Sequence, residues 1–367
     1  MIKSLVFILT FLCSFLMQAQ QNNHNLLIGT YTKSCESNGI YVYDFNSETG
    51  DFQLKSSTKK VINPSFLALS PDKKYVYCVN EDGDKSQISA FKYEAGSGKF
   101  SFLNAVSSLG NDPCHILTDG KNVIVSNYSG GSLVVLKKNE DGSLSGDNEV
   151  NQFSGSSINK SRQGKPHIHQ AVLSPDNKYL LVADLGSDAI YSYQYHPESE
   201  KGTLKSKKVN FVKPGSGPRH LAFSADGKFV YTIHELDGSI CVYRFNKGEL
   251  SLSYSTTIIP KAGDEISCAE IALSKDGNYL YTTNRGTFNT ITCYKIKNNG
   301  KLEYVQMTKT LGKGPRSFAI DPSGNFLLIA HQYSNDIVVF KIDKTTGMLT
   351  DTDKKLDLCS PVCLVFE

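Results

Sequence analysis

Tryptophan is missing from this chain of 367 residues, and only five of its 39 basic residues are arginines. A sequence without tryptophan cannot carry the Trp-Asp signature of WD repeats. Basic and acidic residues nearly balance, at 39 and 36, and no basic run stands out. This composition argues against nucleic acid as a partner. Beyond the first twenty residues, no apolar run approaches the length of a membrane span, so we expect none.

The N-terminus has the pattern of an export signal. Lys3 supplies a positive charge, residues 5–17 form an apolar run, and Ala19 provides a small residue near the expected cleavage point. The apolar run is too short to remain in a bilayer as a span. We therefore expect residues 1–20 to be a signal peptide. Residues 21–367 should then form a domain that is exported to the periplasm or secreted.

Eight cysteines lie outside the signal segment, and in an exported protein an even number invites a disulfide interpretation. However, Cys78, Cys241 and Cys293 fall inside apolar runs typical of strands, and no C-x-x-C pair occurs. A core of this size does not need covalent links to be stable. We expect most of these cysteines to be buried free thiols.

One phrase recurs along the chain: an X-Pro step, a short apolar strand, a Ser/Asp-Gly/Asn-Lys turn and an aromatic-rich strand. It is clearest at 64–81, 218–235 and 315–332. Weaker or shortened copies begin at positions 113, 168, 268 and 361. The seven starting points are 46 to 55 residues apart, which is the spacing of one four-stranded propeller blade per repeat.

The strands of one blade are expected at 219–223, 228–234, 239–245 and 250–258, each bounded by Gly, Asn or Asp. The two ends of the chain are incomplete copies. The N-terminal one, from residue 26, lacks a first strand, and the last copy, from Pro361, contains only a first strand. The terminal strands therefore close one blade, which removes an open sheet edge. The prediction is an all-β, seven-bladed β-propeller.

Polar side chains gather at one end of the predicted blades. The first two strands of a blade are antiparallel, so the start of one and the end of the other lie together. These positions hold His169, Arg219, Glu235, Arg285 and Arg316. Further histidines at or next to these positions are His115, His167, His220, His234 and His331. The blades repeat but these residues do not, which indicates a site at the mouth of the central channel.

Arginine beside histidine and glutamate suits one kind of chemistry. Arginine grips carboxylate or phosphate with parallel hydrogen bonds, and His or Glu can move a proton when its pKa lies near neutrality. One reaction that fits is the opening of a lactone, in which His169 or Glu235 activates water while Arg219 and Arg285 hold the oxyanion. We expect substrate-binding roles for His167, His220, His234, Arg316 and His331. No G-x-S-x-G nucleophile motif occurs.

A metal site is the weaker alternative. His167 and His169 are two residues apart on one strand, and a pair of imidazoles could bind zinc. Arg219, Arg285 and Arg316 would repel a cation there, and no carboxylate cluster surrounds the two histidines. We expect no metal and no other cofactor.

The sequence resembles the seven-bladed lactonases typified by propeller-type 6-phosphogluconolactonase, with the fungal carboxymuconate cyclases as relatives. The matching phrases are GPRHLAF (217–223), HEL (234–236), NR (284–285), GPRSFAID (314–321) and HIHQAVLSPDN (167–177). The resemblance implies metal-free catalysis by His169, Glu235, Arg219 and Arg285. The export signal is a departure from a family that works on a cytoplasmic sugar phosphate, so the substrate could be a non-phosphorylated lactone.

Three functions remain open at this point. A lactone hydrolase acting on a small molecule is favoured. A lactonising isomerase would run related chemistry without hydrolysis. A non-catalytic propeller would bind an anion or a protein at the same face. We expect a monomer or a weak dimer.

Overall fold

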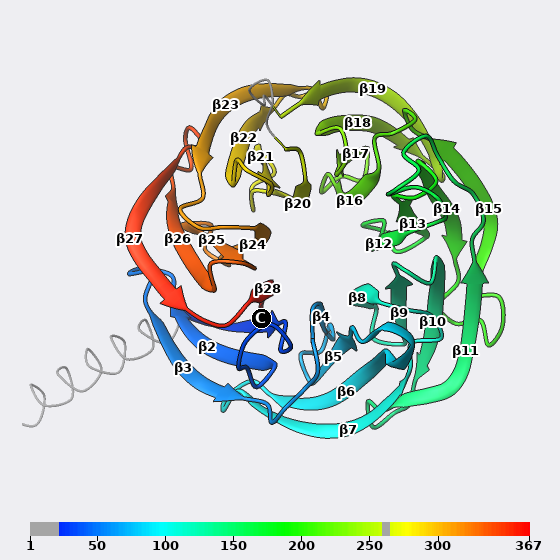
Figure 1. Ribbon diagram of the computed structural model, residues 1–367, viewed down its shortest axis with the longest axis horizontal. Coiled ribbons are helices and arrows are strands. Elements are labelled where there is room, and N and C mark those ends of the chain that lie inside the picture. The colour runs from blue at the N-terminus through cyan, green and yellow to red at the C-terminus, as the bar shows by residue number, and fades with distance from the viewer. Residues whose placement is uncertain (1–21, 259–264) are drawn as a thin grey trace, which may run out of the picture.

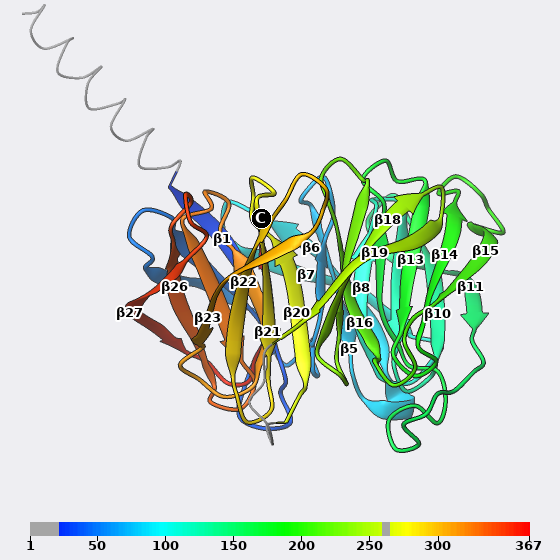
Figure 2. The same cartoon turned by 90° about the horizontal axis from the view of Figure 1, so that it is seen from above.

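The computed structural model describes residues 22–258 and 265–367, and the predicted signal segment, residues 1–20, lies outside them. Seven four-stranded antiparallel sheets stand around a common axis (Figure 1). Seen from the side, their strands run between the two faces of a disc (Figure 2). The predicted seven-bladed β-propeller is therefore confirmed. Among the described residues, no helix has the length and apolar character needed to span a membrane.

Each blade contributes one strand at each of four distances from the axis. The innermost strands are β28 (Pro361–Phe366), β4 (Leu67–Leu69), β8 (Pro113–Thr118), β12 (Ile168–Leu173), β16 (Pro218–Phe223), β20 (Cys268–Leu273) and β24 (Pro315–Ile320). The second strands are β1 (Asn23–Thr30), β5 (Tyr75–Asn80), β9 (Asn122–Asn127), β13 (Tyr179–Asp184), β17 (Phe229–His234), β21 (Tyr279–Asn284) and β25 (Phe326–His331).

The third strands are β2 (Ile40–Asn46), β6 (Gln87–Glu94), β10 (Ser132–Lys138), β14 (Ala189–Tyr195), β18 (Ser239–Asn246), β22 (Thr290–Ile296) and β26 (Asp336–Ile342). The outermost strands are β3 (Phe52–Ser57), β7 (Lys99–Ser107), β11 (Leu144–Gln152), β15 (Leu204–Phe211), β19 (Glu249–Thr257), β23 (Leu302–Lys309) and β27 (Leu349–Asp357). A single 3₁₀ turn, η1 (Gly83–Lys85), follows β5.

The first blade is closed by the two ends of the chain, as the sequence predicts. Its strand order is β28-β1-β2-β3, so the C-terminal strand is innermost and pairs antiparallel with β1. A disulfide between Cys35 and Cys359 adds a covalent link beside this pairing. Six other cysteines are free and buried, which confirms the expectation for most of them. The disulfide itself was not anticipated, because its cysteines are 324 residues apart.

Apolar side chains fill the interfaces between neighbouring blades. Between blades four and five, Leu181 and Ile190 pack with Leu221 and Val230. The interface between blades seven and one is equivalent, and Leu364 of the closing strand belongs to it. Since both faces of a blade are covered, its inner strands read as continuous apolar runs. The outermost strands, such as β15, are exposed along most of their length.

The recurring turn has a structural role that explains its repetition. In blade five the hydroxyl of Ser224 donates to Asp226 at 2.7 Å and accepts from the backbone N–H of Phe229 at 2.9 Å. Gly227 in this turn has a φ of +68°, a conformation that favours glycine. The same bonds join Ser174, Asp176 and Tyr179 in blade four. This turn lies at the end of the blade opposite the predicted site.

Candidate active site

A β-bulge recurs at the start of the innermost strand and aims the predicted site residues. In blade five Pro218 pairs with His234 and His220 pairs with Ile233, so Arg219 has no partner in the ladder. The register shifts in the same way around His169 and around Arg316. A bulge leaves one residue unpaired and turns its side chain out of the regular alternation. In these three blades the residue predicted after the repeat start therefore occupies this bulged position.

A carboxylate surrounded by arginines is the centre of the site. Glu235 follows β17 and accepts from the Arg219 Nε at 3.0 Å, while the Nη2 of Arg285 lies 3.0 Å from the same carboxylate. A third guanidinium, that of Arg162, donates from Nη2 to Glu235 Oε1 at 2.6 Å. We call these four residues the arginine cluster. Arg219, Glu235 and Arg285 are buried, so the cluster concentrates charge in a largely dehydrated place.

Backbone carbonyls hold two of the arginines in place. Arg219 donates from Nη1 to the carbonyl of Ala269 at 2.6 Å, which joins blade five to blade six. Arg285 donates to the carbonyls of Ser267 and Cys268, at 3.2 and 3.3 Å. These contacts fix both guanidinium groups before any ligand arrives. Such preorganisation is what electrostatic stabilisation of a developing negative charge requires.

The arginine cluster keeps Glu235 ionised. Burial alone would raise the pKa of its carboxyl, but the Arg285 and Arg219 guanidinium groups outweigh burial and lower the pKa to about 2. The sequence-based idea of a glutamate poised near neutrality therefore does not describe Glu235 in this arrangement. Its carboxylate balances and orients the arginines, and it is a weak proton acceptor while all three remain bound.

His169 is the basic group beside the arginine cluster. Its ring centroid lies 5.6 Å from that of Tyr128 and 5.1 Å from that of His220. Burial, followed by the positive charge of Arg219, lowers the pKa of His169 well below its usual value. The imidazole is therefore neutral near pH 7 and has a free lone pair, and the same burial and positive charges make it a weaker base than an exposed histidine.

A second group of polar side chains lies at the same end of the propeller as the arginine cluster, on the other side of the ring axis. Glu81, at the end of β5, accepts from the Tyr31 hydroxyl at 2.8 Å and from the Ser65 hydroxyl at 2.7 Å. The Arg316 guanidinium lies 5.5 Å from the centroid of the Tyr31 ring. Within the described residues it makes no hydrogen bond and no ion pair. We call Tyr31, Ser65, Glu81 and Arg316 the tyrosine side.

Two histidines predicted for substrate binding are instead engaged inside their own blades. His234 is hydrogen-bonded to Thr232 and Ser239, each at 2.9 Å, and His331 to Asp336 at 2.7 Å. Other blades use the equivalent position to fasten the loop before the innermost strand; Asn80, for example, donates to the carbonyl of Ile62. The structure does not bring His234 and His331 into contact with the arginine cluster.

His167 and His220 lie next to the site. The His167 ring stacks on Tyr128 with centroids 4.3 Å apart, and its Nδ1 is 3.0 Å from the Tyr128 carbonyl oxygen. His220 is buried below His169 and is hydrogen-bonded to Glu270. The zinc hypothesis needs further ligands around His167 and His169. Among residues 22–258 and 265–367, no three His, Cys, Asp or Glu side chains are grouped so that they could hold a metal ion.

Arg162 and Glu270 were missed in the sequence. Arg162 belongs to the loop between β11 and β12. Two features of the sequence could have indicated Arg162 as a site residue. Arginine is rare in this chain, and the spacing of 55 residues between the repeat starts at 113 and 168 is the longest between successive repeats. Glu270 lies on β20 immediately after the ring position held by Ala269, and no repeated pattern marks it.

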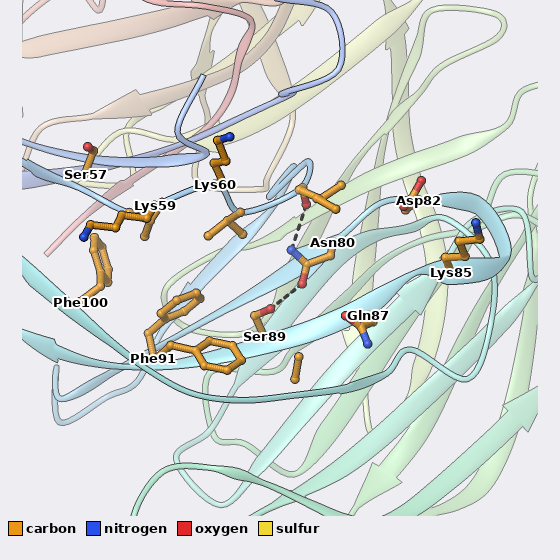
Figure 3. Close-up of a pocket in the computed structure, with 15 residues that line it drawn as sticks. Ser57, Lys59, Lys60, Asn80, Asp82, Lys85, Gln87, Ser89, Phe91 and Phe100 are labelled. Carbon is orange, nitrogen blue, oxygen red and sulfur yellow. Dashed lines mark hydrogen bonds between the residues drawn. The ribbon is translucent and has the colours of Figure 1, made fainter. Parts of the chain in front are cut away.

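The groove drawn in Figure 3, of about 500 Å³, lies elsewhere. It is lined by the end of β3 and by β6 and β7, with Phe91, Phe100 and Lys59 among its residues. Asn80 at its edge is already bonded to the carbonyl of Ile62 and to the hydroxyl of Ser89, at 2.9 and 2.6 Å. No histidine or arginine is among the residues that line this groove, so it has no counterpart of the arginine cluster.

The fold and this site together define a seven-bladed propeller in which arginine, histidine and glutamate side chains are clustered at one end of the ring axis. The family model described as "Lactonase, 7-bladed beta-propeller" matches residues 25–366. The chain belongs to this family.

Relatives support the same assignment. A 6-phosphogluconolactonase of Formosa agariphila is 39% identical over 338 residues, which cover 90% of this chain and 96% of the relative. The 6-phosphogluconolactonase of Bacillus subtilis is 30% identical over 345 residues, covering 92% and 97%.

Solved structures agree. A putative 6-phosphogluconolactonase from Bacteroides fragilis matches with a TM-score of 0.91 and 39% identity, covering 94% of this chain and 98% of that one. A periplasmic gluconolactonase from Pseudomonas aeruginosa matches with a TM-score of 0.88 and 33% identity, covering 94% and 99%.

Proposed function

We propose that this protein is a lactone hydrolase and that the arginine cluster and His169 carry out the reaction. The observation that carries the proposal is a buried imidazole beside two arginines that are held in place by Glu235 and by backbone carbonyls. Relatives named for lactone hydrolysis support it.

The reaction uses water and needs no further reactant. A water oxygen adds to the lactone carbonyl carbon while its proton passes to His169. Guanidinium N–H groups of Arg219 and Arg285 stabilise the oxyanion that forms. When the ring C–O bond breaks, the ring oxygen takes the proton back from His169, and a hydroxy acid is released. Glu235 stays ionised throughout and keeps both arginines oriented.

The tyrosine side is proposed to bind the rest of the substrate. Arg316 offers N–H donors for an anionic group, and Tyr31, Ser65 and Glu81 offer partners for hydroxyl groups. His167 at the rim is the other predicted binding residue that is in position to contribute.

The decisive experiment is a lactone panel in a pH-stat with the mature protein, from residue 21 onward. The panel includes aldonolactones with and without a phosphate group. We expect acid release that the His169→Gln variant reduces strongly at unchanged folding. A folded protein that opens no lactone would contradict the proposal and favour a binding propeller. Formation of lactone from an added unsaturated acid, without hydrolysis, would favour the isomerase.

Export is a separate proposal. It is motivated by the N-terminal charge and apolar run, and the P. aeruginosa structure is named as periplasmic. Mass spectrometry of the N-terminus, on protein recovered from periplasmic and cytoplasmic fractions, tests it. Recovery of uncleaved chain from the cytoplasm would refute it.

A further inference from the structure

A buried histidine–carboxylate pair, formed by His220 and Glu270, lies next to His169. His220 of β16 and Glu270 of β20 come from blades five and six, and His220 Nδ1 is 2.7 Å from Glu270 Oε1. The Glu270 carboxylate also accepts from the N–H of Ile271 at 3.1 Å. An ionised carboxylate can only accept, so the Nδ1 of His220 carries the hydrogen. Its Nε2 then presents a lone pair when the ring is neutral.

Three neighbouring imidazoles each have one buried nitrogen without a partner in the part of the chain that the structure describes. His220 Nε2, His169 Nδ1 and His115 Nδ1 are inaccessible and have no hydrogen-bond partner among the described residues. The His220 ring centroid lies 5.1 Å from that of His169 and 6.1 Å from that of His115. A buried polar group without a partner costs about 1–3 kcal/mol, so three of them in one place call for an explanation.

The charged groups around His169 and His220 differ, and this difference determines which of the two rings holds a proton more favourably. Arg219, Arg285 and Arg316 all oppose a positive charge on His169. Around His220, Arg219 and Arg316 also oppose it, but Glu270 in direct contact favours it. A proton received by His169 is therefore held better one ring further in.

We propose that Glu270 and His220 form a proton relay beneath His169. This rests on the proposed lactone hydrolysis. When His169 takes the proton of the attacking water on one ring nitrogen, it passes the proton of its other nitrogen, Nδ1, to His220 Nε2. These two nitrogens are not hydrogen-bonded to each other in the structure, so the transfer requires the two rings, whose centroids are 5.1 Å apart, to turn toward one another. The resulting imidazolium is paired with the Glu270 carboxylate. As the ring oxygen leaves, His220 returns the proton to His169, so no net charge or atom is gained. Glu270 and His220 are positioning residues, because they act through His169.

The same chain contains a matched control. His331 and Asp336 form a buried pair with the same 2.7 Å contact between Nδ1 and a carboxylate oxygen, and His331 Nε2 is likewise without a partner. That pair lies within blade seven, and no ring contact joins it to His169 in the described part of the chain. Comparing Glu270→Gln with Asp336→Asn therefore separates a relay from the structural role of a buried pair.

The relay predicts different outcomes for the two substitutions. Glu270→Gln should lower kcat by about 10², with KM unchanged and an altered pH profile, because a general acid–base contribution is lost. Glu270→Asp should recover part of kcat. Asp336→Asn should lower the melting temperature and leave kcat and the pH profile as in wild type. A Glu270→Gln variant that behaves like Asp336→Asn would overturn the relay.

An NMR measurement in the absence of substrate tests the relay independently of the proposed lactone hydrolysis. Nitrogen-15 NMR of the histidine rings should show His220 protonated at Nδ1 in the wild type, with its nitrogen shifts changed by Glu270→Gln. A His220 protonated at Nε2 instead would contradict the relay even if lactones are hydrolysed. If His220 is protonated at Nδ1 but the protein opens no lactone, the His220–Glu270 pair exists as described and the proposed function is refuted.

Discussion

Glu235 and Glu81 occupy the same position in their blades, one residue beyond the second strand, yet they have opposite kinds of partners. Glu235 is bound by guanidinium groups of Arg162, Arg219 and Arg285. Glu81 is bound by the hydroxyls of Tyr31 and Ser65. One scaffold position therefore serves two purposes on the two sides of the ring axis.

The difference shows what each side can do. In the arginine cluster, fixed charges satisfy one another and hold two guanidinium groups in a defined orientation. On the tyrosine side, neutral hydroxyls satisfy the carboxylate, and the Arg316 guanidinium is left without an anionic partner in the described residues. The first arrangement suits stabilisation of a transient charge. The second suits recognition of a polar or anionic substituent.

The largest effect is expected when β28, the strand that closes the ring, is removed. The tyrosine side depends on β28, because this strand completes the blade that carries Tyr31 and packs against the blade that carries Arg316. A chain truncated after Ser360 should unfold or aggregate, measured by circular dichroism and solubility. A Cys35→Ser/Cys359→Ser variant, which keeps the strand and loses only the disulfide, is the control and should stay folded. A soluble truncated chain with unchanged melting temperature would contradict the importance of closure.

The next effect concerns the arginine cluster alone. Glu235→Gln keeps the shape of the side chain but removes the charge that orients the arginines. We expect kcat to fall by ~10²–10⁴, the range for loss of an acid–base or electrostatic group. The corresponding substitution on the tyrosine side, Glu81→Gln, should act mainly on KM. Equal and small effects at both carboxylates would remove the functional distinction between the two sides.

The ionised state of Glu235 also predicts how stability depends on pH. Its pKa is lowered from 4.5 to about 2 in the folded protein, despite burial, by Arg285 and Arg219. Its stabilising contribution is therefore complete above about pH 4.5 and is lost as pH falls towards 2. The loss is on the order of 3 kcal/mol. Urea unfolding at several pH values should show this loss in the wild type and not in Glu235→Gln. Parallel pH dependence in the two proteins would contradict it.

The repeats made the fold and much of the site predictable. Arg219, Glu235 and Arg285 could be placed at one end because antiparallel pairing fixes where strands start and stop. The same argument included His234 and His331, which face into their blades, because spacing alone does not say which side of a strand end points to the axis. Arg162 could not be placed, since it lies between β11 and β12, outside the phrase that recurs along the chain. The lowered pKa of Glu235 depends on this third arginine as well.

A smaller effect is expected from the tyrosine side. Arg316→Gln removes a charge that makes no hydrogen bond or ion pair with the described residues and only a cation–π contact with Tyr31, so folding should be little affected. Charge-assisted hydrogen bonds are worth about 1.5–3 kcal/mol, which corresponds to a rise in KM of roughly tenfold to a hundredfold for a lactone with an anionic group. Arg244→Gln is the control, because Arg244 lies on β18 over the Phe229 ring. A KM that rises equally for neutral and anionic lactones would argue against anion recognition by Arg316.

The smallest effect is expected from Arg162, the member of the arginine cluster that lies in the loop between β11 and β12. Its side chain is 41% exposed, against 2% for Arg219 and 10% for Arg285. Partly exposed ion pairs contribute about 0–1 kcal/mol, so Arg162→Gln should change stability little. Glu235 keeps two guanidinium partners in this variant, so kcat should fall far less than in Arg219→Gln. A double-mutant cycle with Glu235→Gln in urea unfolding should give a coupling of at most about 1 kcal/mol. A loss of kcat as large as that of Arg219→Gln would instead place Arg162 among the groups that contact the substrate.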